Sequence, residues 1–232
     1  YDYIETGSLV SIKKNVQHIV IPSEEHSETL FPMDFEEFYW AIGNTASPEQ
    51  LRQAFAMQRP IGDAVHHRWM RDWRLYMLVG GMPQSIVAYI ENNRDFYASD
   101  QEKRDILDLY RDDIRKASRK YHSKVSALFE NLPGYLSTHE KRVVLSHIDE
   151  NGRYSQYDEP LFWLDDSMIC NLCYKCNDPN VGLALNKDDT AVKCYMGDTG
   201  LLVSLAFSEN EIPDQQLYKA IMNDRLSLNE GM

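Results

Sequence analysis

The sequence has 232 residues, of which 43% are hydrophobic and 26% charged, a composition typical of a soluble globular protein with one large domain or two smaller ones. Its formal net charge of −12 counts against a generally basic nucleic-acid-binding surface, although a local basic patch remains open. No apolar run approaches the length of a bilayer span, no signal peptide opens the chain, and its four cysteines do not resemble a secreted disulfide framework, so we expect a cytoplasmic protein.

The first part of the chain carries β-like runs and polar turns. Residues 1–9 alternate loosely between apolar and polar and then reach Thr6-Gly7-Ser8, which are ordinary residues of a turn that ends a strand. Two further short β segments are predicted at 18–22 and 29–33. The sequence contains no G-x-x-x-x-G-K-[ST] motif, so no phosphate-binding loop of that kind is present in it.

Two helix-start signals follow these runs. Asp34 precedes Glu37 by three residues, which is the spacing of a capping box. Ser47 precedes Pro48, and proline is favoured at the first position of a helix because its missing N–H has no partner to lose there. We therefore predict helices from both points, and residues 47–93 are expected to be helical throughout.

The segment 75–83, LYMLVGGMP, is the most distinctive in this part of the chain. An apolar run meets Gly80 and Gly81, which permit positive φ angles or a close approach of backbone, and Pro83 opens a new amphipathic segment. The pattern predicts a helix end, a tight turn and a second helix start. From the residues alone, a helix–helix corner is the simplest interpretation.

A long amphipathic pattern follows, with Ser99 and Glu102 as its expected start. It runs over 106–128 as one helix, or as two helices with a break near 118–123. Its polar side carries two basic rows at i,i+4 spacing, made up of Arg111, Arg115 and Arg119 and of Lys116, Lys120 and Lys124. These rows form either a solvated face that nearby aspartates partly neutralise, or a site for a phosphate-bearing ligand, nucleic acid or an acidic patch on a neighbouring domain.

The region after residue 135 predicts helix, helix and β-hairpin, the order of a winged helix. Ser137 and Glu140 are spaced as a capping box for a helix through 148, and Pro160 opens a second helix. β-like runs are expected at 168–176, 181–185 and 190–196. The second helix carries four acidic residues and almost no basic ones, namely Asp158, Glu159, Asp165 and Asp166. Because DNA phosphates would repel them, a spacer is favoured over a DNA reader.

The last part of the chain is predicted to contain a helix at 199–207, capped by Asp198, and another at 212–226. Before it, the four cysteines lie at Cys170, Cys173, Cys176 and Cys194. In a strand, the alternation of side chains puts the first and third of these on one face and the second on the other. We therefore expect buried free thiols and no metal site.

Four segments together resemble one prokaryotic family. They are YIETGSLVSIKK at 3–14, PMDFEEFYWAIG at 32–43, LVGGMP at 78–83 and KCYMGDTGLLVSLAF at 193–207. In this order they resemble AAA-type ATPases of the signal-transduction and archaeal kind, followed by an uncharacterised C-terminal domain of unknown function. Gly81-Met82-Pro83 resembles the G-x-P motif in the helical lid of these ATPases, which lies near the bound adenine.

The resemblance implies an α+β, mainly helical fold. Residues 1–45 would be the end of an AAA core, 46–134 the helical lid with its connecting helices, 135–197 a winged-helix-like domain with a β-hairpin, and 198–232 the start of a truncated C-terminal domain. The chain would then be an internal fragment that lacks the P-loop and the nuclease-like half of that last domain, and it would be inactive as an ATP hydrolase by itself.

The resemblance also implies the site residues. Thr6 or Ser8 would be the sensor that faces the γ-phosphate, and Gly80, Gly81 and Pro83 would lie beside the adenine. ATP and Mg²⁺ are expected in the full-length protein and no cofactor in the fragment. The implied function is a lid and spacer that helps to bind adenine nucleotide and couples its hydrolysis to domain movement, with neighbouring domains and a protein as partners.

Two other classes of function are open. The first is a nucleic-acid-binding winged-helix module that uses the basic helix 111–124. Its candidate contacts are Arg111, Arg115, Lys116, Arg119 and Lys120. The second is a metal-binding module built on the cysteines. No membrane partner is expected.

Overall fold

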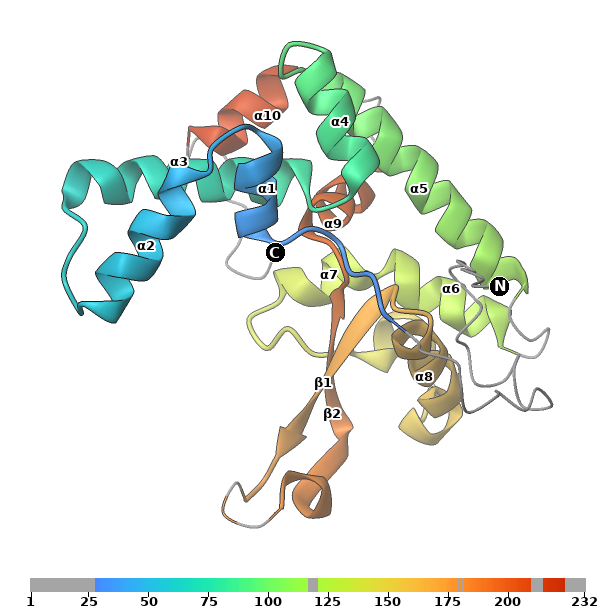
Figure 1. Cartoon of the computed structure of the whole chain (residues 1–232). Coiled ribbons are helices and arrows are strands. Elements are labelled where there is room, and N and C mark those ends of the chain that lie inside the picture. Colours follow the sequence, from blue (N-terminus) through green and yellow to red (C-terminus); the bar gives the residue numbers. More distant parts are fainter. Residues whose placement is uncertain (1–27, 117–120, 179, 181, 210–214, 224–232) are drawn as a thin grey trace, which may run out of the picture. The chain divides into compact units, whose positions relative to one another are not determined.

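In the computed structural model the chain is mainly helical, with a small two-stranded antiparallel sheet (Figure 1). The structure describes residues 28–116, 121–178, 180, 182–209 and 215–223. Among the helices of these residues, none is both long and apolar enough to cross a membrane. The chain divides into two compact units, which we call by their described parts the corner unit (31–109 and 198–223) and the hairpin unit (28–30 and 110–197).

The corner unit is built from helices of both ends of the described chain. They are α1 (Phe35–Ala41), α2 (Ala46–Ala56), α3 (Asp63–Val79), α4 (Pro83–Glu91), α5 (Phe96–Lys116) up to residue 109, α9 (Thr199–Ala206) and α10 (Gln215–Met222). Helix α3 packs against both α9 and α10. Apolar side chains such as Leu78, Ile86 and Val203 form its core. Val203 of α9 belongs to the same core as Leu78 and Ile86, so helices from both parts of the corner unit share one core.

The hairpin unit contains shorter helices and the sheet. After the end of α5 come α6 (His122–Glu130), α7 (Leu132–Ser137), the 3-10 helices η1 (Leu145–His147) and η2 (Tyr154–Gln156), α8 (Asp158–Asp166), β1 (Cys170–Cys176), η3 (Leu183–Asn186) and β2 (Lys187–Met196). In the antiparallel register Cys170 pairs with Met196 and Leu172 with Cys194. The N–H of Val143 donates a 2.9 Å hydrogen bond to the carbonyl of Val192 in β2.

Several predicted helix starts move by a few residues. The capping box of α1 is confirmed, since the Asp34 carboxylate accepts from the Glu37 N–H at 2.8 Å and the Glu37 carboxylate from the Asp34 N–H at 2.9 Å. Helix α2 begins before Ser47, and the side chain of Asn44 accepts the hydrogen bond from the Ser47 N–H at 3.2 Å. The expected cap at Ser99 is wrong, because α5 begins at Phe96 and Ser99 lies inside the helix.

Three other element predictions are corrected. Ser137 ends α7 and does not open a helix through 148, because the chain bends after it and forms no further helix before η1. The second of the three β-like runs, 181–185, falls on the 3-10 helix η3 from Leu183 onward, and the strands of the first and third runs, β1 and β2, pair with each other. Residues 28–34 belong to neither helix nor strand. The long pattern over 106–128 forms two helices, α5 and α6, as the second alternative predicted.

Candidate functional site

The corner between α3 and α4 is where the sequence placed three of its candidate contacts. Gly80 ends α3 with a φ of +83°, which only glycine adopts easily, and its N–H donates to the Tyr76 carbonyl at 2.7 Å. The Gly81 carbonyl accepts a 2.8 Å hydrogen bond from the N–H of Met33. A β-carbon on Gly81 would overlap the backbone of Met33. Close packing inside the corner unit therefore explains both glycines without a ligand.

Pro83 differs from the two glycines because it is exposed. It is the first residue of α4, and Val87 and Ile90 follow it at i+4 and i+7 with exposed fractions of 50% and 40%. These three residues form an apolar stripe along the outside of α4. Of the predicted adenine-side contacts, Pro83 has a side chain that a ligand can reach, whereas Gly80 and Gly81 are buried.

The side chain of Asp198 contacts this corner. As the N-cap of α9 it accepts a 2.8 Å hydrogen bond from the Leu201 N–H through Oδ1. Its other oxygen, Oδ2, accepts from the Gly81 N–H at 2.5 Å. Burial raises the pKa of the Asp198 carboxyl, and the hydrogen bonds from these amides oppose that rise. The cap was predicted from the sequence, but the bond to Gly81, 117 residues away, carried no sequence signal.

Two buried hydroxyls hold the same corner from the side of α4. The hydroxyl of Ser85 donates to the carbonyl of Val79 at 2.7 Å and lies 2.8 Å from the hydroxyl of Ser99. The carbonyl of Val79 is one of the last in α3, where no N–H inside the helix can reach it. The position of Ser85 among the apolar residues of α4 was the sequence signal for this contact, and sequence reasoning missed it.

A buried lysine and a buried aspartate, Lys103 and Asp100, lie on α5 in the same unit. The ammonium of Lys103 donates to the Leu78 carbonyl at 2.7 Å and to the Tyr218 hydroxyl at 3.4 Å. Its nitrogen lies 3.8 Å from Oδ1 of Asp100. Burial lowers the pKa of Lys103 to about 8, although the charges of Asp100 and Asp198 oppose this change.

Asp100 is the centre of this polar network. It accepts from Nε of Arg104 at 2.7 Å, from the hydroxyl of Ser204 at 2.5 Å and from the hydroxyl of Tyr218 at 2.6 Å. Burial alone would raise the pKa of Asp100, but the charge of Lys103 and these hydrogen bonds together hold it below its ordinary value. The network joins α5 to α9 and α10. With its charges paired, it has the character of a structural core and not of a catalytic centre.

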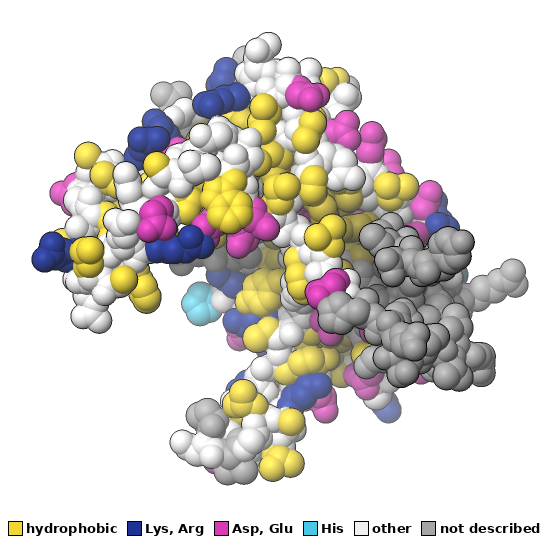
Figure 2. All heavy atoms as spheres, in the orientation of Figure 1, with side chains coloured by type: hydrophobic (Ala, Val, Ile, Leu, Met, Phe, Trp, Pro, Cys, Tyr) yellow, Lys and Arg dark blue, Asp and Glu magenta, His cyan; other side chains and the backbone are white. Residues whose placement is uncertain are grey.

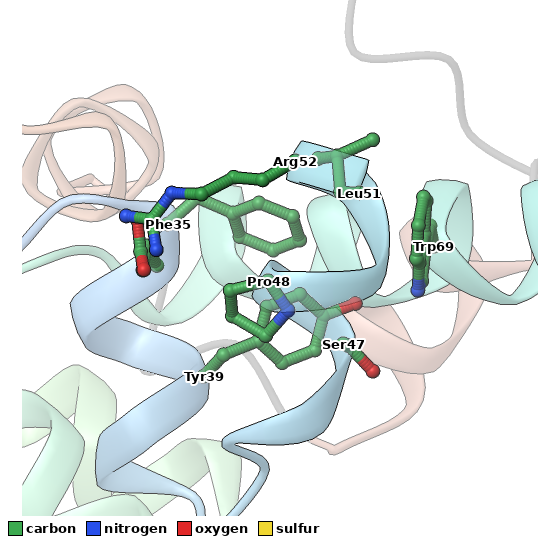
Figure 3. Close-up of a pocket in the computed structure, with 8 residues that line it drawn as sticks. Phe35, Tyr39, Ser47, Pro48, Leu51, Arg52 and Trp69 are labelled. Carbon is green, nitrogen blue, oxygen red and sulfur yellow. The ribbon is translucent and has the colours of Figure 1, made fainter. Parts of the chain in front are cut away.

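A shallow pocket of about 90 Å³ lies between α1, α2 and α3 (Figure 3). It is lined by Phe35, Glu36, Tyr39, Ser47, Pro48, Leu51, Arg52 and Trp69. Arg52 pairs with Glu36, and hydrophobic side chains also reach the surface over α2 (Figure 2). Pockets for nucleotide-sized ligands measure about 300–1,000 Å³. This pocket is therefore too small to enclose a nucleotide, and sequence reasoning did not predict it.

The two basic rows have acidic neighbours. In the hairpin unit Nε of Arg111 pairs with Glu130 at 2.8 Å. The other two pairs lie within α5, where Arg115 pairs with Asp112 and Lys116 with Asp113. Lys124 lies 4.6 Å over the ring of Tyr157. Arg119 and Lys120 lie outside the described residues. These pairings favour the interpretation of a neutralised surface over the nucleic-acid alternative.

The cysteines lie on β1 and β2 as the strand alternation predicts. The expectation of buried free thiols holds for Cys170 and Cys194 but is wrong for Cys173, which is exposed, and Cys176 is half-buried; all four thiols are free. The contact with Cys194 and burial raise the pKa of the Cys170 thiol. In the described parts of the chain, no group of three or more His, Cys, Asp or Glu side chains is placed to hold a metal ion. Thr6 and Ser8, the candidate sensors, lie outside the described residues.

Comparison with protein families gives a match over residues 70–212, more than half of the chain, to a Domain of unknown function (DUF8612). The chain belongs to the DUF8612 family. The match begins within α3 and includes the corner, Asp198 and the whole described sheet. No curated protein and no solved structure matches the chain. DUF8612 carries no description of an activity, so the resemblance to AAA-type ATPases stays a prediction.

Proposed function

We propose that the corner unit is the lid-like part of an AAA-type ATP-binding protein and that its corner contacts the adenine of the bound nucleotide through Pro83. The observation that carries this proposal is the exposure of Pro83 at the first position of α4, next to two glycines whose backbone is fixed on both sides. The Gly81-Met82-Pro83 resemblance to the lid motif supports the same position.

The corner holds Pro83 in a defined place. Gly81 is bonded to Met33 on one side and to Asp198 on the other, so the backbone before α4 has little freedom to move. Pro83 and Val87 offer an apolar surface from this fixed backbone. Ligand sites are lined mainly by apolar groups on a pre-formed scaffold, and the flat faces of a purine suit such a surface.

The corner unit supplies only one wall of the proposed site. The pocket between its helices is too small for a nucleotide, and the chain contains no G-x-x-x-x-G-K-[ST] motif. In this proposal the phosphates and Mg²⁺ are therefore bound by other parts of the full-length protein, with Thr6 or Ser8 as the sensor. The chain contributes the adenine contact, and movement of the lid follows binding and hydrolysis.

The hairpin unit is proposed to be a winged-helix-like spacer. Helix α8 is followed by the β1–β2 hairpin, and the Val143 N–H donates a hydrogen bond to the Val192 carbonyl in β2. The exposed side of α8 carries Asp158, Glu159 and Asp165 around Phe162. DNA phosphates would repel this acidic face, so a neighbouring domain or a protein is the proposed partner.

The test is a titration of the natural full-length protein with a fluorescent ATP analogue. Pro83→Ala is compared with Pro160→Ala, which changes a buried proline in the first turn of α8 in the hairpin unit. Loss of the apolar contact at Pro83 is expected to weaken binding by about 1 kcal/mol, roughly fivefold, whereas Pro160→Ala leaves the affinity unchanged. Thr6→Ala is expected to leave binding intact and slow hydrolysis.

Two results would contradict the proposal. The first is the absence of saturable binding that unlabelled ATP displaces from the wild-type protein. The second is an equal affinity for Pro83→Ala and Pro160→Ala, which would leave 75–83 as a helix corner with no role in binding.

A further inference from the structure

A single carboxylate joins two backbone segments that are far apart in the sequence. Oδ2 of Asp198 accepts the Gly81 N–H at 2.5 Å, and Oδ1 accepts the Leu201 N–H in the first turn of α9 at 2.8 Å. The first amide lies two residues before Pro83. The position of the α9 N-terminus is thus linked directly to the backbone that presents Pro83.

The two segments also touch without room for a side chain. A β-carbon on Gly80 would overlap the carboxylate of Asp198. One on Gly200 would lie 2.6 Å from both the Gly80 nitrogen and the Val79 carbonyl oxygen. Real β-carbons do not approach other atoms so closely, so the N-terminus of α9 lies against the backbone of the corner. Because such close packing cannot stretch, a shift of α9 must either move the corner or break the Asp198 bond.

Helix α9 and the residue that follows it are also hydrogen-bonded to side chains of α5. The hydroxyl of Ser204 donates to Asp100 at 2.5 Å, and Nη2 of Arg104 donates to the carbonyl of Phe207 at 3.1 Å. Both partners lie on α5. The polar network therefore sets the position of α9, and Asp198 passes that position on to Gly81.

Asp198 has one more acceptor oxygen than an N-cap residue needs. One oxygen, as in serine, is enough to accept from the third N–H of a helix. The second oxygen of Asp198 has its partner outside α9, at Gly81. The ammonium of Lys103 also attracts the negative charge of the Asp198 carboxylate, and a serine at this position would carry no such charge. The hydrogen bond to the Gly81 N–H explains why a carboxylate, with two acceptor oxygens, lies at position 198.

We propose that Asp198 is a positioning residue for the corner, and that helix α9 controls through it the position of Pro83. The part of this inference that concerns a ligand rests on the proposed nucleotide contact. Since coupling between two sites is reciprocal, any binding event that shifts α9 changes the affinity of the ligand at Pro83, and binding of that ligand favours one position of α9 by the same free energy.

The first measurement is hydrogen exchange at the Gly81 amide, and it does not depend on any ligand. Asp198→Ser keeps an oxygen for the Leu201 N–H but has no second oxygen for Gly81. We expect exchange at Gly81 to become at least about tenfold faster, because its one acceptor is lost, while the amides of α9 stay protected. Asn44→Ala removes a comparable side-chain acceptor, the one that binds the Ser47 N–H near the start of α2, and is expected to leave exchange at Gly81 unchanged.

A second variant acts at a distance from the corner. Ser204→Ala leaves Asp198 in place and removes the bond between α9 and Asp100. It is expected to speed exchange at Gly81 by a smaller factor than Asp198→Ser, because α9 is then held less firmly. If Gly81 stays as protected in Asp198→Ser as in the wild-type protein, the positioning role of Asp198 is overturned.

The second measurement repeats the fluorescent-ATP titration of the full-length protein with the same variants. Asp198→Ser is expected to bind the analogue about tenfold more weakly, and Asn44→Ala is expected to bind it as the wild type does. If Gly81 is released but the wild-type protein binds no analogue, the positioning role stands and the proposed function fails. If the wild type binds and Asp198→Ser binds equally well with Gly81 released, control of the ligand site is overturned.

Discussion

The polar network around Asp100 in the corner unit and the charge pairs at the end of α5 in the hairpin unit differ in burial and in the origin of their partners. In the corner unit Asp100 is fully buried, and its partners come from α5, α9 and α10. In the hairpin unit Arg115 and Lys116 are exposed, and each pairs with an aspartate three residues earlier on the same helix. Exposed pairs contribute little to stability, whereas removing one member of a buried pair leaves an uncompensated charge. Arg115 and Lys116, although conspicuous in the sequence, are therefore expected to contribute little to stability, and Asp100, which looked ordinary in the sequence, is expected to contribute more.

The largest effect is expected from Asp100→Ala. It leaves Lys103 buried without its anion and removes the acceptor of Ser204 and Tyr218. Breaking a buried ion pair on one side costs about 3–5 kcal/mol, so the free energy of unfolding should fall by that amount in urea titrations. Asp112→Ala, on the exposed side of α5, is the matched control. A loss below about 1 kcal/mol for Asp100→Ala would mean that the network does not stabilise the corner unit.

The next largest effect on the free energy of unfolding is expected from replacing Gly81 by alanine, with Gly134 as the comparison. Gly81→Ala places a β-carbon against the backbone of Met33, which cannot move aside as a flexible side chain would. We expect a loss of about 3 kcal/mol, the upper part of the range for overpacked sites. Gly134→Ala, in α7 of the hairpin unit, meets nothing within 4 Å and should stabilise by about 0.5–1 kcal/mol, because alanine favours a helix. Equal losses in thermal or urea unfolding would refute the packing argument.

A smaller effect depends on pH. Burial lowers the pKa of Lys103 from its ordinary 10.5 to about 8, so above pH 8 the unfolded chain binds more protons at this residue than the folded chain. The contribution of Lys103 to stability therefore rises with pH between 8 and 10.5, by on the order of 1–2 kcal/mol from pH 8 to pH 9.5.

The measurement is the difference in unfolding free energy between the wild-type protein and Lys103→Met across this pH range. Tyrosines titrate in both proteins and cancel in the difference, so the difference should grow as pH rises. A difference that is constant between pH 8 and pH 9.5 would show that Lys103 does not titrate there.

The smallest effect is expected from Arg115→Ala. Its guanidinium is exposed and pairs with Asp112, one turn earlier on α5. The free energy of unfolding should change by less than about 0.5 kcal/mol and less still at high salt. A loss above about 1 kcal/mol at 0.15 M salt would mean that the basic rows have a structural role that the pairings do not show.

Local signals in the sequence were enough for much of the fold. The capping box of Asp34 and Glu37, the proline start of α4 and the cap at Asp198 each depend on residues within one helical turn, and the structure has all three. The predictions at Ser99 and Ser137 were wrong because a serine three residues before a glutamate can also lie inside a helix or at its end. At Ser99, a hydrogen bond to Ser85 takes the place of the capping bond.

The long-range contacts that build the candidate site could not be predicted from these local sequence signals. Asp198 meets Gly81 across 117 residues and Tyr218 meets Asp100 across 118, and no periodicity or spacing encodes partners so far apart. The sequence did indicate that Gly80 and Gly81 need special backbone geometry, but it could not tell a ligand from another part of the chain as the reason. The AAA-type function proposed for Pro83 stays a prediction.

The most direct test of the difference between the two units is a pair of double-mutant cycles. One combines Asp100→Asn with Tyr218→Phe in the corner unit, and the other combines Asp112→Ala with Arg115→Ala in the hairpin unit. Urea unfolding gives the coupling energy of each pair. We expect about 1–3 kcal/mol for the buried pair and below about 0.5 kcal/mol for the exposed pair. Equal coupling energies, or a larger value for the exposed pair, would contradict the account.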